Sequence, residues 1–213
     1  MPPTFSLLAI SDRTSLAAHG IGVEDWLRSL GGMDNVAVQL REKDLDDRVL
    51  LELARAARAA LPPTIPLLVN GRLDVALAAG ADGVHLPADG VPVAPLRARF
   101  GSSSLARGIL IGRSTHSVAE VERARDEGAD YVTFGPVWET PGKGTPVGTG
   151  ELARAVAAGV PVYALGGVTL ERFGELAAAG AAGVAAIRLF QRTPDLPEVT
   201  RMARELFGRG DRA

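Results

Sequence analysis

AAGADGVHL at residues 78–86, DEGADYVTF at 126–134 and AAGAAGVAA at 178–186 follow one plan. In each, a stretch rich in alanine or charged residues ends at a glycine, which suits the left-handed end of a helix, and a short apolar strand follows. The three segments start 48 and 52 residues apart, which is about two strand–helix units of some 25 residues each. The 213 residues then hold roughly eight such units, so we expect a single domain over residues 1–213.

The eight expected strands are continuous apolar runs rather than alternating ones, as in IPLLV. Continuous runs are typical of parallel strands that helices cover on both faces. We expect strands at 5–10, 35–40, 65–69, 82–86, 108–112, 130–134, 160–165 and 182–187, with helices between them, for example at 45–61 and 169–179. Such units can close into a barrel or lie open as a doubly wound sheet. Eight units in a chain of this length, with polar residues after nearly every strand, favour a (β/α)8 TIM barrel.

The composition excludes several classes of protein. A formal net charge of −2 gives no reason to expect a nucleic-acid or anionic membrane partner, and no apolar run reaches the roughly 18 residues of a membrane span. Because cysteine is absent, disulfides and thiolate zinc sites are excluded, and His19, His85 and His116 are too scattered for a metal cluster. The first residues lack the basic start of a signal peptide. We therefore expect a soluble, cytoplasmic protein with no nucleic-acid or membrane partner.

Polar residues follow the carboxyl ends of nearly all the expected strands. In a TIM barrel these positions share one mouth. They are Asp12, Arg13, Gln39, Arg41, Lys43, Asn70, Arg72, His85, Arg113, Ser114, His116, Glu139, Lys143, Gly166, Gly167 and Arg188. Cations and amide donors that point to one place from many strands indicate an anion site. In ALGGV (164–168), two glycines free their backbone amides for a phosphate at the start of a helix.

Each of these features also has a purely structural interpretation. QLREK at 39–43 can be a solvated strand end, although its polar residues alternate onto one face. ALGGV can be a plain turn between a strand and a helix, and His85 can be a hydrogen-bonded core histidine. The loop at 135–150, with five glycines and three prolines, can be a surface linker. Its length and its Lys143 near an aromatic residue favour a lid.

Six motifs, in this order along the chain, resemble those of the thiamine phosphate synthase/TenI family of thiamin biosynthesis. They are QLREK (39–43), LLVNGR (67–72), GVHLP (83–87), IGRSTHS (111–117), GADYVTFGPVWETPGKG (128–144) and the pair ALGGV (164–168) and GVAA (183–186). The resemblance implies a TIM-barrel enzyme whose small-molecule ligand is a thiazole phosphate, and we also expect a homo-oligomer. The substrate and its phosphate are then expected to contact Gln39, Arg41, Lys43, Asn70, Arg72, Ser114, Thr140, Gly166, Gly167, Ile187 and Arg188.

The family holds two activities, and the motifs divide between them. Synthases join a pyrimidine pyrophosphate to the thiazole phosphate, with magnesium bridging the pyrophosphate. The resemblance puts the metal-binding aspartates at Gly71 and Gly90, with Asp89 one step away, and the loss of these carboxylates should weaken magnesium binding. VNGR, HLP, IGRS and ET…KG instead match TenI-type thiazole tautomerases, which isomerise a thiazole carboxylate phosphate without a metal. We therefore expect a tautomerase that uses no cofactor and binds no metal; a synthase with Mg²⁺ is the alternative.

One departure from the tautomerases favours the synthases. Pro136 stands where tautomerases carry a catalytic histidine, and QLREK is more synthase-like. A tautomerase here needs another acid–base group, from His85, His116 or Glu139, with Lys143 as a further catalytic residue of the loop. His85 is the first choice, because imidazole titrates near neutral pH and this residue follows the fourth strand directly. A third interpretation is a non-catalytic barrel that only binds a thiazole phosphate.

Overall fold

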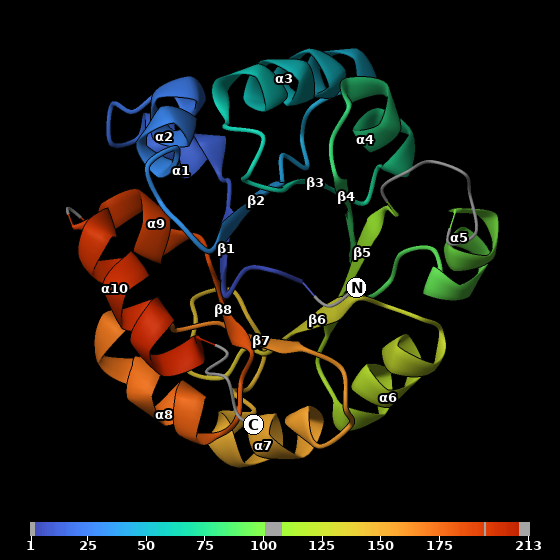
Figure 1. The fold of residues 1–213 in the computed structure, drawn as a ribbon, viewed down its shortest axis with the longest axis vertical. Helices are drawn as coiled ribbons and strands as arrows, with labels where there is room; N and C mark the ends of the chain where they lie inside the picture. Colours follow the sequence, from blue (N-terminus) through green and yellow to red (C-terminus); the bar gives the residue numbers. More distant parts are fainter. Residues whose placement is uncertain (1–2, 101–107, 194, 209–213) are drawn as a thin grey trace.

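The computed structural model describes residues 3–100, 108–193 and 195–208. Eight parallel strands close into a barrel in chain order (Figure 1). They are β1 (Leu7–Ile10), β2 (Val36–Leu40), β3 (Leu67–Asn70), β4 (Gly83–Leu86), β5 (Leu110–Thr115), β6 (Tyr131–Phe134), β7 (Val162–Leu165) and β8 (Gly183–Ala186). Each expected strand overlaps an observed one, so the predicted TIM barrel is confirmed.

Helices form a ring around the barrel (Figure 1). They are α1 (Arg13–Ala17), α2 (Val23–Leu30), α3 (Asp47–Ala60), α4 (Leu73–Ala79), α5 (Val93–Phe100), α6 (Val118–Asp126), α7 (Gly148–Val156), α8 (Phe173–Ala178), α9 (Arg188–Arg192) and α10 (Leu196–Phe207). The helix expected at 45–61 is α3, and it begins where the Asp46 side chain accepts from the Val49 amide, a cap worth about 1 kcal/mol. The helix expected at 169–179 is broken into a 3-10 turn, η1 (Leu170–Arg172), and the short α8.

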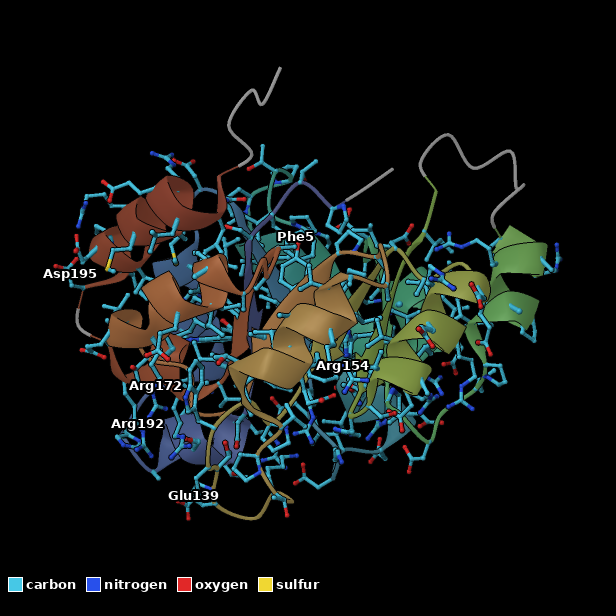
Figure 2. All side chains as sticks on the ribbon, turned by 90° about the horizontal axis from the view of Figure 1, so that it is seen from below. Phe5, Glu139, Arg154, Arg172, Arg192 and Asp195 are labelled. Carbon is cyan, nitrogen blue, oxygen red and sulfur yellow. The ribbon has the colours of Figure 1, made fainter. Side chains whose placement is uncertain are left out.

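Three apolar clusters stabilise this arrangement. The largest lies between the strands and the helices, one fills the barrel itself, and one joins β4 and β5 to α5. Inside the barrel, the rings of Phe5, Tyr131 and Tyr163 pack with centroids 5.2–5.6 Å apart. Figure 2 shows Phe5 at one end of the barrel and Glu139 at the other. The aromatic residues therefore close the amino-terminal end, which leaves the carboxyl ends of the strands as the open mouth.

Within the described ranges, none of the helices combines the length and the apolar character that a bilayer span requires.

Candidate active site

The innermost layer of side chains at the mouth is polar on one side and apolar on the other. Side chains alternate along a strand between the barrel interior and the surrounding helices. Asn70 pairs in register with His85, and Ser114 pairs in register with Thr133, so the two members of each pair lie on the same face of the sheet. Gln39 on β2 continues this polar arc, which therefore runs from β2 to β6. Leu165, Ile187 and Ile10 belong to the apolar interior and complete the circle from β7 to β1.

Gln39 is a buried polar residue in this layer. It is only 1% exposed, and its Nε2 atom has no hydrogen-bond partner among the described residues. An unpaired buried amide is destabilising by about 1–3 kcal/mol. A ligand that accepts from this amide removes that penalty, so the position is suited to recognising a polar edge of a ring.

His85 is held in the barrel by hydrogen bonds at both ring nitrogens. Its Nδ1 lies 3.0 Å from the Tyr131 hydroxyl, and its Nε2 lies 3.0 Å from Ser114 Oγ and 3.4 Å from Thr133 Oγ1. Burial lowers the pKa of His85 to about 3, and the charges of Arg41 and Arg113 act in the same direction. The imidazole is therefore neutral at pH 7 and a poor proton acceptor. Burial and these charges count against an acid–base role of His85, which stays a prediction.

Three cations from two distant segments gather beside this layer. Arg41 and Lys43 follow β2, and Lys143 comes from the loop at 135–150. Partial desolvation lowers the pKa of Lys143, and the nearby charges of Arg41 and Lys43 lower it further. None of the three forms an ion pair with a carboxylate in the described ranges. We call Arg41, Lys43 and Lys143 the cationic cluster; it has the charge that an anionic ligand requires.

A buried acid positions the backbone of the cationic cluster. The Ser11 hydroxyl donates to Glu42 Oε1 (2.5 Å) and accepts from the Arg41 amide (2.9 Å). Glu42 also accepts from the Arg13 amide at 3.2 Å. Burial raises the pKa of Glu42, although its hydrogen bonds with Ser11 and Arg13 oppose the shift. The Ser11–Glu42 pair thus ties the end of β1 to the end of β2, and no local sequence signal predicts it.

Arg72 was expected to bind substrate, but its guanidinium is already paired. It donates to Asp74 at 3.0 and 2.7 Å and forms a second, shorter ion pair with Asp47. Two carboxylates therefore compensate its charge, which disfavours the substrate role that stays a prediction for Arg72. Arg113 is also engaged, through hydrogen bonds to carbonyl oxygens of the loop after β4, such as that of Ala88 at 2.8 Å.

The glycine pair after β7 has a packing explanation. Gly166 and Gly167 have φ values of 95° and 67°, a region that favours glycine. A Cβ on Gly166 would lie 2.6 Å from the Cβ of Pro136, and one on Gly167 equally close to the Cβ of Trp138. The loop at 135–150 therefore packs directly on this turn. Because η1 and the six-residue α8 replace the expected helix, the helix-dipole argument for phosphate is weak here.

The loop at 135–150 is fastened at its base. The Val137 amide donates to Leu165 O (2.9 Å), the Trp138 amide to Gly166 O (3.2 Å) and the Val147 amide to Pro136 O (2.8 Å). The exposed residues 141–146, which include Lys143, lie between these anchors. The lid expected from the sequence stays a prediction, and residues 141–146 are the part of the loop that these hydrogen bonds leave free to close.

The remaining predicted residues lie around the mouth. Glu139 and His116 are exposed, and His116 Nδ1 lies 2.6 Å from the carbonyl oxygen of Gly135 at the start of the loop. Thr140 Oγ1 donates to Trp138 O at 3.0 Å, so it stabilises the loop base. Arg188 is exposed at the start of α9, directly after Ile187. The phosphate roles of Gly166, Gly167, Ile187 and Arg188 stay predictions.

The carboxylates that magnesium needs are not gathered here. Mg²⁺ prefers octahedral oxygen ligands, usually with one or two protein carboxylates. The two positions that the family resemblance assigns to metal ligands are Gly71 and Gly90, and neighbouring Asp89 is exposed. The described residues contain no group of three His, Cys, Asp or Glu side chains that could hold a metal ion. Among the described residues, the two positions expected to hold the metal therefore supply no carboxylate to a magnesium ion.

Comparison with known proteins gives a consistent set of relatives. A family model described as thiamine monophosphate synthase matches residues 7–190. A putative thiamine-phosphate synthase from Geobacter sulfurreducens is 46% identical over 207 residues, which is 92% of each chain. A thiamine-phosphate synthase from Methanoculleus marisnigri is 41% identical over 84% of each chain. Among solved structures, a thiamine phosphate pyrophosphorylase from Pyrococcus furiosus superposes with a TM-score of 0.79 at 27% identity, over 96% of each chain.

Proposed function

This chain belongs to the thiamine monophosphate synthase family, and we propose that it is a thiamine-phosphate synthase, which joins a pyrimidine pyrophosphate to a thiazole phosphate. The relatives described above carry the synthase name, which favours this activity over the tautomerase activity expected from the sequence motifs.

The observation that carries the proposal is the cationic cluster. When pyrophosphate leaves, negative charge builds on its oxygens, and preorganised donors at that point stabilise the transition state. Arg41 and Lys43 lie near enough to Lys143 for their charges to lower its pKa. A multiply charged anion bound among these cations is therefore stabilised by all three.

The chemistry of coupling also suits a neutral His85. The bond between the pyrimidine methylene carbon and the pyrophosphate oxygen breaks, and the pyrophosphate leaves with the electron pair. The lone pair of the thiazole nitrogen forms the new carbon–nitrogen bond. No proton moves in either event, so the reaction needs no general base, and a histidine with a pKa of about 3 is no obstacle. No step here is routed through a metal ion, because the two positions expected to hold one are glycines, Gly71 and Gly90.

The mouth provides both kinds of surface that two heteroaromatic rings need. The polar arc from β2 to β6 offers donors and acceptors to ring nitrogens, including the unpaired Gln39 amide. Leu165, Ile187 and Ile10 offer an apolar surface on the opposite side. Apolar walls with a few placed polar groups are typical of small-molecule sites.

Tautomerisation of a thiazole carboxylate phosphate is the second candidate, and the glycines at 71 and 90 favour it because it requires no metal. It does require proton transfer at a ring carbon. With His85 buried and neutral, His116 and Glu139 remain, and both are exposed.

One assay separates these functions. The purified chain receives thiazole phosphate and pyrimidine pyrophosphate, and thiamine phosphate is measured by chromatography, with and without Mg²⁺. In parallel, thiazole carboxylate phosphate is followed by absorbance in EDTA. We expect thiamine phosphate to form. Isomerisation without coupling would contradict the proposal and favour the tautomerase, and the absence of both reactions would favour a non-catalytic barrel.

A further inference from the structure

A chain of three hydrogen-bonding side chains runs from the sealed centre of the barrel to the mouth. Tyr131 is fully buried, His85 is 2% exposed, and Ser114 is partly exposed. The Tyr131 hydroxyl lies 3.0 Å from His85 Nδ1, and His85 Nε2 lies 3.0 Å from Ser114 Oγ. Gly112 makes room for the first contact, because a Cβ there would lie 2.6 Å from His85 Nδ1.

The direction of the first hydrogen bond follows from burial. Burial raises the pKa of Tyr131 well above its ordinary value, so its hydroxyl keeps its proton. The aromatic rings of Phe5 and Tyr163 pack against the ring of Tyr131. Among the described residues, His85 Nδ1 is the hydrogen-bond partner that the Tyr131 hydroxyl has. If Nδ1 carried a proton instead, the hydroxyl proton of Tyr131 would be buried without an acceptor, which is unfavourable.

The direction of the second hydrogen bond follows from the first. A neutral imidazole carries one proton, and with Nδ1 accepting from Tyr131 that proton is on Nε2. Nε2–H then donates to Ser114 Oγ, since Thr133 Oγ1 is more distant at 3.4 Å. Ser114 Oγ thus accepts a hydrogen bond from His85 on its buried side. Its own hydroxyl hydrogen can then be donated to another group.

We propose that Tyr131 is a positioning residue: it holds His85 in the Nε2–H tautomer, so that Ser114 presents its hydroxyl hydrogen to an anionic ligand oxygen in the mouth. The charge of Arg41, a member of the cationic cluster, lowers the pKa of His85, so the cluster and this hydrogen-bonded chain lie at the same end of the barrel. The identity of the ligand as a pyrophosphate rests on the proposed function. The tautomer of His85 does not.

The tautomer can be read directly by two-bond ¹⁵N–¹H NMR of histidine-labelled protein. In a His19→Gln/His116→Gln background His85 is the single histidine. We expect its spectrum to show an Nε2–H imidazole that does not change between pH 5 and 8. Tyr131→Phe should move the Nδ1 resonance and mix the two tautomers. Tyr163→Phe is the matched control: it removes another buried hydroxyl, which donates to Phe5 O, and should leave the His85 spectrum unchanged.

Binding of inorganic pyrophosphate, measured by calorimetry, tests the consequence for the ligand. Tyr131→Phe and Ser114→Ala should each weaken binding roughly three- to tenfold, the effect of one hydrogen bond. The double variant should lose no more than Ser114→Ala alone, because both changes remove the same donor. Tyr163→Phe should bind as wild type does.

The outcomes keep the two proposals apart. An Nδ1–H tautomer in the otherwise unchanged protein overturns this inference, whatever the enzyme catalyses. Additive losses in the double variant also overturn it, because Tyr131 would then act without Ser114. An Nε2–H tautomer in a protein that binds no pyrophosphate overturns the proposed function, and with it the ligand named here.

Discussion

Arg172 lies over the indole ring of Trp138, with its guanidinium carbon 4.6 Å from the ring centroid. The same guanidinium donates from Nη1 to the carbonyl oxygen of Gly167. One residue of η1 therefore holds the loop at 135–150 against the turn after β7. Figure 2 shows Arg172 near the end of the barrel where Glu139 of that loop lies. The loop base is fixed by a side chain as well as by its backbone hydrogen bonds.

Replacing this guanidinium should release the indole. Arg172→Gln removes a cation–π contact worth about 0.5–2 kcal/mol. We expect Trp138 to become more exposed and the tryptophan emission to move to longer wavelength. Trp26 gives a constant background, because it is buried and donates to Phe190 O. Arg154→Gln is the control, since that guanidinium pairs with Glu151 on the exposed face of α7. Equal emission from both variants would show that Arg172 does not hold the loop.

Two arginines at the mouth should differ in their importance for coupling. Arg41→Gln removes a charge of the cationic cluster, and the loss of one charge-assisted hydrogen bond lowers kcat/KM by roughly 10- to 100-fold. Arg72→Gln should change kcat/KM much less, because Asp47 and Asp74 already neutralise that guanidinium. The measurement is the initial rate of thiamine phosphate formation for both variants. A larger loss in Arg72→Gln than in Arg41→Gln would contradict the assignment of the cationic cluster.

Stability should decrease in mild acid because His85 is buried as the neutral form. Its folded pKa of about 3 lies below its ordinary value of 6.5, so the unfolded chain takes up the proton first as the pH falls. Above pH 6.5, His85 adds no pH dependence to the free energy of unfolding. Between 6.5 and 3 it lowers the unfolding free energy by about 1.4 kcal/mol per pH unit, or roughly 2 kcal/mol at pH 5.

Urea unfolding at pH 7 and pH 5 measures this effect. His85→Gln should lack it, while its amide can still bond to Tyr131 and Ser114. Glu42 acts in the opposite sense, because its raised pKa favours the folded state as the pH falls, but it does so equally in both proteins. The same loss of stability in wild type and variant would place the titrating group elsewhere.

The fold could be predicted from the sequence because its signals are local. Gly80, Gly128 and Gly180, which mark the repeat, all have positive φ values next to the ends of α4, α6 and α8. Each short apolar run becomes a strand within a few residues of the expected bounds. Repeated units of a helix followed by a buried parallel strand can be connected in only a few topologies, and the closed barrel is one of them.

The state of each polar side chain could not be predicted in this way, because it depends on partners that are distant in the chain. From the sequence, His85 resembled a group that titrates near neutral pH. Its hydrogen-bond partners Ser114 and Tyr131 lie on other strands, β5 and β6. Arg72 looked free, and Asp47 of α3 pairs with it. The period of two along β6 does put Tyr131 and Thr133 on one face, and that signal could have marked them as neighbours of His85.

The same reasoning predicts where a metal site can be restored. Gly71 and Gly90 follow adjacent strands, and a Cβ on either would approach the ring of Pro87, at 3.6 and 3.0 Å respectively. Side chains at both positions would therefore approach the same proline ring, which brings two carboxylates near one another. Gly71 has a φ of 68°, and a side chain in that conformation is unfavourable by about 1–3 kcal/mol, so some loss of stability is expected.

We expect Gly71→Asp/Gly90→Asp to bind Mg²⁺ measurably by calorimetry in the presence of pyrophosphate, and to bind it more tightly than wild type does. Two carboxylates supply the hard oxygen ligands that the ion prefers, whereas one leaves most of the coordination to water. Each single variant should therefore show less than half of the double variant's gain in the free energy of Mg²⁺ binding. Gly32→Asp/Gly159→Asp is the control for two added negative charges, since a Cβ at either glycine meets no atom within 4 Å. Both glycines precede a strand, at the end of the barrel away from the mouth. If this control raises the affinity for Mg²⁺ as much as Gly71→Asp/Gly90→Asp does, the gain comes from net charge, and positions 71 and 90 do not form a metal site in this barrel.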